Sequence, residues 1–204
     1  MFIKRKIQSP LTWGLLLWMF IANACGNTVR DGDSYLNYPD TQLLLEQYLN
    51  AYKKLPNTFR VVTLENEKAD TQYLKANEMS WKDIEAPFLK AGFFDEKNDK
   101  QYSIQVLHDT INQRMSLYYK ALNEPLYTQQ ATIQAQWPSN KVYSMYFECH
   151  KKSVFGEAHY KLLYSVGKTI QIQSNETALW GKPTKKMISI QFLNGTAATT
   201  APAE

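Results

Sequence analysis

The sequence predicts an α+β domain in which N-terminal helices pack on a curved antiparallel β-meander of about six to eight strands. Two observations lead to this fold class. In residues 40–55 and 80–92, apolar residues recur at steps of three and four, which is the period of an amphipathic helix. From residue 102 onward, apolar residues alternate with polar ones, which is the period of a strand with one buried face.

The first expected element is a helix that Asp40 caps and that Pro56-Asn57 ends. Residues 59–64 then predict a strand, and residues 70–74 predict its return strand after a polar turn. A polar helix over residues 65–77 is the alternative that this pattern leaves open. The apolar face of the first helix consists of Leu44, Leu45, Tyr48, Tyr52 and Leu55.

A second helical segment is expected to begin at Ser80, with Asp83 in the position of a weak capping box, and to end at Gly92. Pro87 lacks the N–H that the helix needs there, so the segment is expected to be kinked or split at this residue. Its apolar residues can still cover one face of a sheet; they are Trp81, Ile84, Phe88 and Leu89.

Seven alternating segments follow and predict the meander, with turns at residues 138–140 and 167–168. Their buried phases begin with Ile104 and Val106 and continue with Met115, Leu117, Tyr119, Ile133, Ala135, Trp137, Tyr143, Met145, Phe147, Cys149, Tyr160, Leu162, Tyr164, Val166, Ile170, Ile172, Ile188, Ile190 and Phe192.

The first 24 residues have the composition of an export signal. Lys4, Arg5 and Lys6 form a cationic start, an apolar run covers residues 11–21, and small residues lead to Ala24. The apolar run is shorter than the ~20 residues that a membrane-spanning helix needs. We therefore expect residues 1–24 to be a signal peptide, 25–39 a tether, 40–193 one α+β domain and 194–204 a disordered tail.

Cys25 directly follows the expected cleavage site, which predicts a lipoprotein that carries fatty acyl chains such as palmitate on this residue. Its expected location is the bacterial cell envelope, anchored to a membrane on the periplasmic side or in the outer membrane. Ala22 and Ala24 also fit an ordinary secretory cleavage site, and in that case a disulfide between Cys25 and Cys149 becomes feasible. The phase of its strand favours a buried, unreactive thiol for Cys149.

The charge of the chain argues against binding to nucleic acid. The sequence has 23 Lys and Arg against 19 Asp and Glu, which is a net charge of +4. Loss of the signal removes three cations and no acid, and leaves a nearly neutral domain with only short lysine pairs. A nucleic-acid-binding protein would need a basic stripe.

The sequence contains no Gly-rich phosphate loop and no H-E-x-x-H, C-x-x-C or G-x-S-x-G motif. We therefore expect that the protein has no catalytic residue, binds no cofactor and is not an enzyme. Weak candidates for a zinc site are Glu148 and His150, on the outward face of one strand, and His159 at the start of the next. Solvated side chains are the simpler interpretation of these three. His108 and Asp109 could form a base and its orienting acid, although an Asp in this place more often caps a turn.

Four aromatic residues are candidates for a binding patch near one end of the sheet, because Tyr and Trp combine apolar area with a polar group. They are Tyr118, Trp137, Tyr146 and Trp180. Thr110 lies in the tripeptide Asp109-Thr110-Ile111, which matches a short acceptor pattern for O-glycosylation.

Four segments carry a resemblance to a known family: WKDIEAPF at 81–88, YYKAL at 118–122, LLYS at 162–165 and IQIQ at 170–173. They resemble segments of uncharacterised small lipoproteins of Bacteroidota-type bacteria. The resemblance spans about residues 40–192 and implies the order helix, hairpin, Trp-containing helix and antiparallel meander, with no known activity.

These observations predict a membrane-anchored envelope lipoprotein that acts as a non-catalytic binding or structural module. Its expected partners are the membrane, through acylated Cys25, and an envelope protein or apolar ligand. Two alternatives stay open. One is a carrier that holds a lipid or other apolar ligand in a cavity between helices and sheet, and the other is a metal-dependent enzyme that uses the surface His/Glu cluster.

Overall fold

The computed structural model describes residues 41–92 and 101–193. The expected signal peptide, Cys25, the tether, the Asp40 cap and the C-terminal tail lie outside the described residues. No helix within the described ranges is long and apolar enough to span a membrane.

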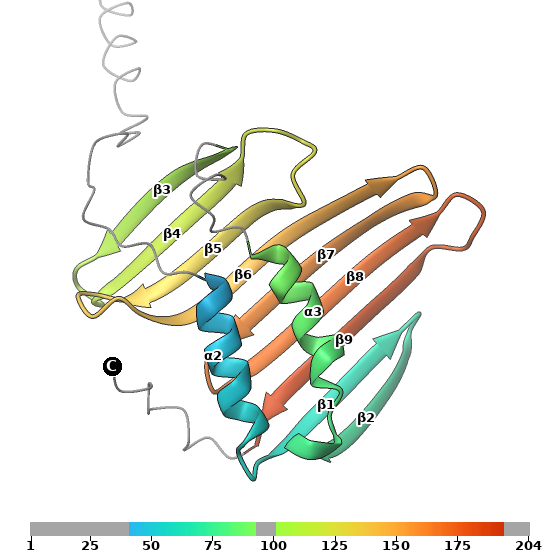
Figure 1. Ribbon diagram of the computed structural model, residues 1–204, viewed down its shortest axis with the longest axis horizontal. Coiled ribbons are helices and arrows are strands. Elements are labelled where there is room, and N and C mark those ends of the chain that lie inside the picture. The colour runs from blue at the N-terminus through green and yellow to red at the C-terminus, as the bar shows by residue number, and fades with distance from the viewer. Residues whose placement is uncertain (1–40, 93–100, 194–204) are drawn as a thin grey trace, which may run out of the picture. The chain divides into compact units, whose positions relative to one another are not determined.

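Nine antiparallel strands form one sheet, with two short helices beside it (Figure 1). Across the sheet the strand order is β2-β1-β9-β8-β7-β6-β5-β4-β3. Along the chain the elements are α2 (Thr41–Lys53), β1 (Thr58–Glu65), β2 (Lys68–Lys75), the 3-10 turn η1 (Ala76–Glu78), α3 (Trp81–Ala91), β3 (Tyr102–Asp109), β4 (Arg114–Ala121), β5 (Thr128–Gln136), β6 (Lys141–Ser153), β7 (Gly156–Ser165), β8 (Thr169–Ala178) and β9 (Thr184–Phe192).

The meander is confirmed, but the protein is more strongly β than expected. The prediction of six to eight strands is wrong because the β1–β2 hairpin does not stand apart from the meander. Strand β1 pairs with β9, with Phe59 opposite Phe192, and so extends the sheet to nine strands. The prediction of a hairpin over residues 59–74 is confirmed. The alternative, a polar helix over residues 65–77, does not form, and only residues 76–78 make a helical turn.

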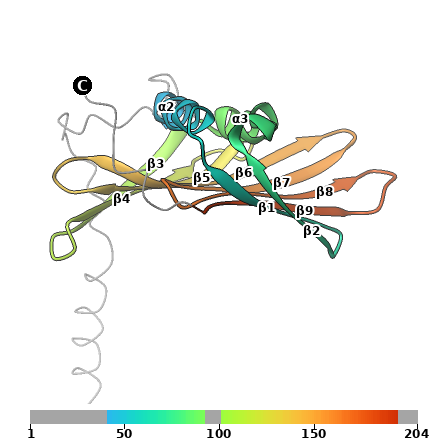
Figure 2. The same ribbon diagram turned by 90° about the horizontal axis from the view of Figure 1, so that it is seen from below.

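Both helices lie on the same face of the sheet (Figure 2). Leu45 and Leu49 of α2, and Phe88 and Ala91 of α3, are completely buried. Helix α3 runs without a break through Pro87, so the expected split does not occur. The missing N–H costs one ladder hydrogen bond, and burial of Ile84 and Phe88 offsets this loss.

Aromatic rings fill the space between the helices and the sheet. Phe88 of α3 meets Phe147 of β6 and Tyr164 of β7 edge-on, with ring centroids 6.5 and 6.4 Å apart. Phe59 of β1 lies 5.0 Å from Phe192 of β9 in the same manner. Offset and edge-on contacts at these distances are those of a close-packed core.

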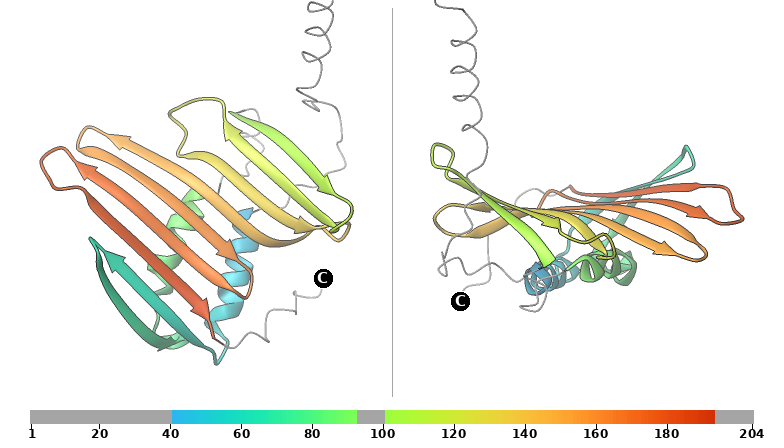
Figure 3. Two further views of the ribbon diagram at one scale, coloured as in Figure 1. Left: turned by 180° about the vertical axis from the view of Figure 1, so that it is seen from behind. Right: turned by 90° about the horizontal axis from the view of Figure 1, so that it is seen from above.

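No helix of residues 41–92 and 101–193 covers the other face of the sheet (Figure 3). Its side chains belong to the alternate phase of each strand, and many are polar, such as Gln134, Gln171 and Lys161. The β6–β7 and β8–β9 turns lie at the same end of the sheet and project beyond the helices (Figure 1).

Candidate metal centre on the uncovered sheet face

The β6–β7 hairpin brings two histidines together. Strands β6 and β7 pair with His150 directly opposite His159. Side chains at positions i and i+2 of a strand share a face, so Glu157 lies on the same face as His159. The turn between these strands contains only Val154 and Phe155, because Ser153 pairs with Gly156. This short turn sets the register that aligns the three side chains.

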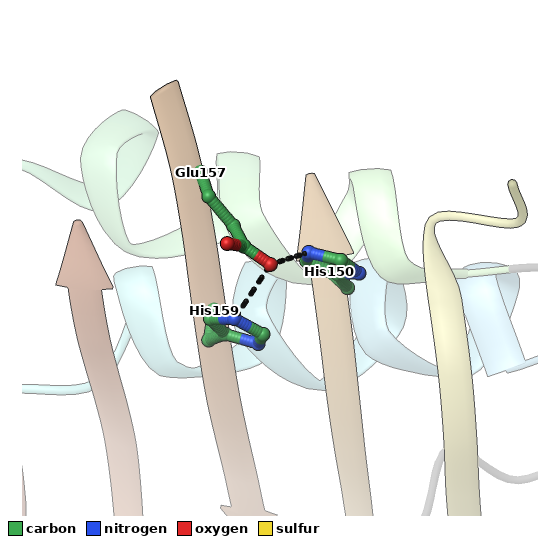
Figure 4. Close-up of side chains that lie close together, drawn as sticks. All are labelled: His150, Glu157 and His159. Atoms are coloured by element: carbon green, nitrogen blue, oxygen red, sulfur yellow. Dashed lines mark hydrogen bonds and ion pairs between the residues drawn. The ribbon is translucent and has the colours of Figure 1, made fainter. Parts of the chain in front are cut away.

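One carboxylate oxygen connects the two imidazole rings (Figure 4). Oε1 of Glu157 lies 2.6 Å from Nε2 of His150 and 3.2 Å from Nε2 of His159. The two rings stack with their centroids 4.4 Å apart and their planes only 4° from parallel. The three potential ligand atoms therefore lie within 4.8 Å of one another.

The electrostatics of the cluster favour an ionised carboxylate. The hydrogen bond from His150 lowers the pKa of Glu157, and the nearby charges of both imidazoles lower it further. A carboxylate and two imidazole nitrogens form a donor set that binds Zn²⁺, with metal–ligand distances of about 2.0–2.2 Å. In a tetrahedral site such ligands are roughly 3.3 Å from each other. The present Glu157 distances are near this value, but the two imidazole planes are parallel, so one ring must turn before both Nε2 lone pairs can point at a single ion.

Glu148 is not the carboxylate of this cluster, contrary to the candidate set of His150, His159 and Glu148. The register places Glu148 opposite Lys161, whose Nζ is 3.4 Å from its Oε1. The same oxygen accepts a hydrogen bond of 2.6 Å from the hydroxyl of Tyr146. The pattern Glu-x-His directly after a two-residue turn is the signal that could have identified Glu157.

Asn175 of β8 lies beside the cluster, opposite His159. Its Oδ1 is buried and has no hydrogen-bond partner among the described residues. Metal-binding histidines usually donate their second ring N–H to an acceptor, and Asn175 offers one next to His159. Asn175 also lines a shallow hollow of about 390 Å³, together with Leu64, Met187 and Lys185.

The four aromatic candidates do not form one patch. Tyr118 and Tyr146 lie on the uncovered face. Thr132 of β5 lies between them and pairs with Tyr118 of β4 on one side and Tyr146 of β6 on the other. Trp137 follows β5 and packs against the ring of His108, with centroids 4.9 Å apart. Trp180 lies in the β8–β9 turn at the other end of the sheet and is 92% exposed.

Asp109 caps the β3–β4 turn, as its simpler interpretation predicted. Its carboxylate accepts hydrogen bonds from the backbone N–H and the side-chain amide of Asn112, at 3.0 and 2.7 Å. The side-chain bond is the main reason why the pKa of Asp109 is lowered. Thr110, the candidate for O-glycosylation, is exposed in the same turn.

Cys149 is buried in the core, as its strand phase predicted. Its side chain contacts the hydroxyl of Thr128 at 3.7 Å. Burial raises the pKa of the Cys149 thiol to about 11. Because the thiolate is the reactive form, the environment of Cys149 favours an unreactive thiol.

Comparisons with known proteins give this chain no family. No protein-family model and no curated protein matches it. The S-type phycobiliprotein lyase CPES from Guillardia theta is a solved structure similar to the chain, with 11% identity, a TM-score of 0.24, and coverage of 76% of this chain and 98% of the lyase. That title names an enzyme and stands against the expectation that the chain is not an enzyme, so this expectation is withdrawn. A likeness this low does not give the chain an activity.

Proposed function

We propose that this protein is a membrane-anchored cell-envelope protein that binds a divalent transition-metal ion through His150, Glu157 and His159. The observation that carries the proposal is the position of one Glu157 oxygen within 3.2 Å of both imidazole Nε2 atoms. Two imidazoles favour Zn²⁺, Cu²⁺ or Ni²⁺, whereas Mg²⁺ and Ca²⁺ prefer sites made of oxygen atoms.

The location of the three residues supports binding of an ion. They lie on paired strands of the sheet rather than on a loop, and a rigid support improves the precision of a metal site. Glu157 and His159 are each about half exposed, so an ion can reach them from solvent. On binding, the metal would replace the protons at the two Nε2 atoms. The Glu157 carboxylate, which interacts with these atoms in the absence of metal, would then bind the metal.

Three protein ligands leave one position of a tetrahedral ion open for water or another ligand. Asn175, which is opposite His159, also lines the hollow with Leu64 and Met187, and this hollow offers room for a bound molecule on the same side of the sheet. The proposal therefore includes a metal ion that a small ligand can approach from the uncovered face of the sheet.

Anchoring through Cys25 is part of the proposal and rests on the sequence. The cationic start, the short apolar run and the small residues before Cys25 support export followed by acylation. The mass of the N-terminal peptide of the mature protein tests this part, because acyl chains on Cys25 add a defined mass. An unmodified Cys25 thiol, or processing that globomycin does not affect, would contradict it.

The carrier alternative receives less support from the described residues. A carrier needs a cavity between the helices and the sheet, and close contacts among Phe88, Phe147 and Tyr164 occupy this region. A ligand would have to separate these rings.

Zinc titration of the purified chain tests the metal site. A Cys25→Ser background removes a competing thiol, and a chromophoric zinc indicator reports the affinity. We expect His150→Ala and His159→Ala each to weaken zinc binding by about tenfold or more, because one of three ligands is lost. Glu157→Gln is expected to weaken it as well, since the neutral amide is a poorer ligand.

Two matched variants serve as controls for this titration. His108→Ala removes the remaining histidine, and Glu148→Gln removes the neighbouring carboxylate of the same face. Both are expected to leave the zinc affinity within about twofold of the parent. Unchanged affinity in His150→Ala and His159→Ala, or an equal loss in His108→Ala, would show that the ion does not bind at this cluster.

A further inference from the structure

Four large apolar side chains are exposed at one end of the sheet. Val154 and Phe155 form the β6–β7 turn, and Leu179 and Trp180 lie in the β8–β9 turn. Their exposed fractions are 86, 79, 62 and 92%, respectively. Isolated exposed apolar residues are common, but four large ones in neighbouring turns form a patch that needs a physical reason. We call these four residues the apolar tip.

The two turns are held together as one projection. The backbone N–H of Leu179 donates a hydrogen bond of 3.0 Å to the carbonyl of Phe155. Gly156 has a φ of +151°, and a Cβ at this residue would lie 2.3 Å from the carbonyl oxygen of Thr177. The glycine thus allows β7 and β8 to approach closely at the base of the tip. The hydrogen bond and this close approach hold the two turns next to each other.

Cationic residues surround the apolar tip. Lys151 and Lys152 precede it on β6, and Lys182 follows it in the β8–β9 turn. Lys185 and Lys186 lie at the start of β9, while the nearby acids of these hairpins are Glu157 and Glu176. The adjoining β1–β2 turn adds Lys68, Glu67 and Glu65, and Glu65 is opposite Lys186. Six lysines against four glutamates leave these three turns with a small positive charge.

We propose that the apolar tip inserts into the interfacial region of an anionic lipid bilayer. Trp and Phe are well suited to the boundary between head groups and acyl chains, and lysines beside them attract anionic head groups. The tip is convex and projects beyond the helices, so it can enter a bilayer without rearrangement of the core (Figure 1). The proposal does not depend on metal binding.

The orientation that follows brings the metal cluster near the lipid surface. His150 of β6 lies four residues before Val154 of the turn, which corresponds to roughly 13 Å along an extended chain. With the tip inserted, the three side chains of the cluster would lie close to the head groups and still face solvent.

Fluorescence quenching by brominated lipids tests the insertion. The full chain is reconstituted into phosphatidylcholine vesicles with or without phosphatidylglycerol, and the emission of Trp180 is obtained as the difference from Trp180→Phe. We expect bromines near the head groups to quench about half or more of the Trp180 emission in the anionic vesicles. Quenching should be weaker without phosphatidylglycerol and at high salt.

Phe155→Ser and Ile111→Ser form a matched pair for this experiment. Both replace a highly exposed apolar side chain in a turn, but Ile111 lies in the β3–β4 turn at the opposite end of the sheet. Phe155→Ser should reduce quenching of Trp180 by about threefold or more, whereas Ile111→Ser should not change it. Circular dichroism checks that both variants keep the fold. Trp180 emission that is not quenched, or that is quenched equally in Phe155→Ser, would overturn the proposal.

Discussion

The hydroxyl of Tyr52 accepts a hydrogen bond of 2.8 Å from the backbone N–H of Gly167, 115 residues further along the chain. Tyr52 belongs to the last turn of α2, and Gly167 lies in the turn between β7 and β8. Gly167 has a positive φ of 65°, which a glycine adopts without strain. This bond connects the end of the helix to the turn between two central strands of the sheet.

Tyr52→Phe should destabilise the fold by about 1–2 kcal/mol, because it leaves the partly buried Gly167 N–H without this acceptor. Tyr73→Phe is the matched control. Tyr73 is 63% exposed on the edge strand β2, so loss of its hydroxyl should change the free energy of unfolding by less than about 0.5 kcal/mol. Urea denaturation followed by circular dichroism measures both. Equal effects of the two variants would contradict a specific role for the Tyr52 bond.

Phe88→Ala should destabilise the protein by about 3–5 kcal/mol, since Phe88 is completely buried between the rings of Phe147 and Tyr164. Leu107→Ala, at a residue that is 59% exposed, should cost much less. The free energies of unfolding of both variants test the packing of the two layers. A loss below about 1 kcal/mol in Phe88→Ala would indicate a loosely filled interior, as the carrier alternative requires.

Local periodicity was sufficient to predict most elements of this fold. Alternation of apolar and polar residues identified β3 to β9, and the apolar face of Trp81, Ile84 and Phe88 identified α3. The pairing of β1 with β9 could not be predicted in this way. It joins strands more than 120 residues apart, and their alternation is compatible with several neighbours.

The candidate site shows the same limit at the level of single residues. The sequence placed His150 and His159 on one face, because both follow the alternation of their strands. The choice between Glu148 and Glu157 depends on the register of the hairpin, which the two-residue turn at Val154 and Phe155 sets. A register different by two residues would have exchanged the carboxylates, so alternation alone could not identify the ligand.

Gly156→Ala should destabilise the protein by about 2 kcal/mol or more. The new Cβ would lie 2.3 Å from the Thr177 carbonyl oxygen, and the backbone conformation is one that alanine rarely adopts. Gly181→Ala is the matched control in the neighbouring turn, where the Cβ would be 3.1 Å from a side-chain methyl group and the cost should be smaller. Thermal unfolding of both variants measures the difference. A Gly156→Ala variant as stable as the parent would contradict the close approach of β7 and β8.

Stability should decrease at alkaline pH because buried acids with raised pKa values must ionise on unfolding. The Cys149 thiol has a pKa of about 11 in the folded protein against 9.0 for an unperturbed thiol. Its contribution is complete below pH 9 and is lost as the pH rises toward 11, since the folded state then holds more protons than the unfolded state. Two pKa units correspond to about 2–3 kcal/mol.

The variant Cys149→Ala tests this assignment. Urea denaturation between pH 8 and about 11 should give a shallower decline of stability in the variant than in the parent, in a background of Cys25→Ser. Burial also raises the pKa of Tyr102 to about 12, so a decline at still higher pH should remain in both proteins. An identical pH dependence below pH 11 would show that Cys149 does not cause the loss.

Zinc should raise the melting temperature of the protein, because an ion that binds only the folded state stabilises it by mass action. At a free zinc concentration about 100 times the dissociation constant, the expected gain is about 2.7 kcal/mol. The gain should increase with zinc concentration, disappear with EDTA, and be absent in the double variant His150→Ala/His159→Ala. His108→Ala should retain it, because His108 lies against Trp137 away from the cluster. If zinc stabilised the double variant as much as it stabilises the parent, the stabilising ion would bind elsewhere. This would be so even if the parent melted at a higher temperature than the variant.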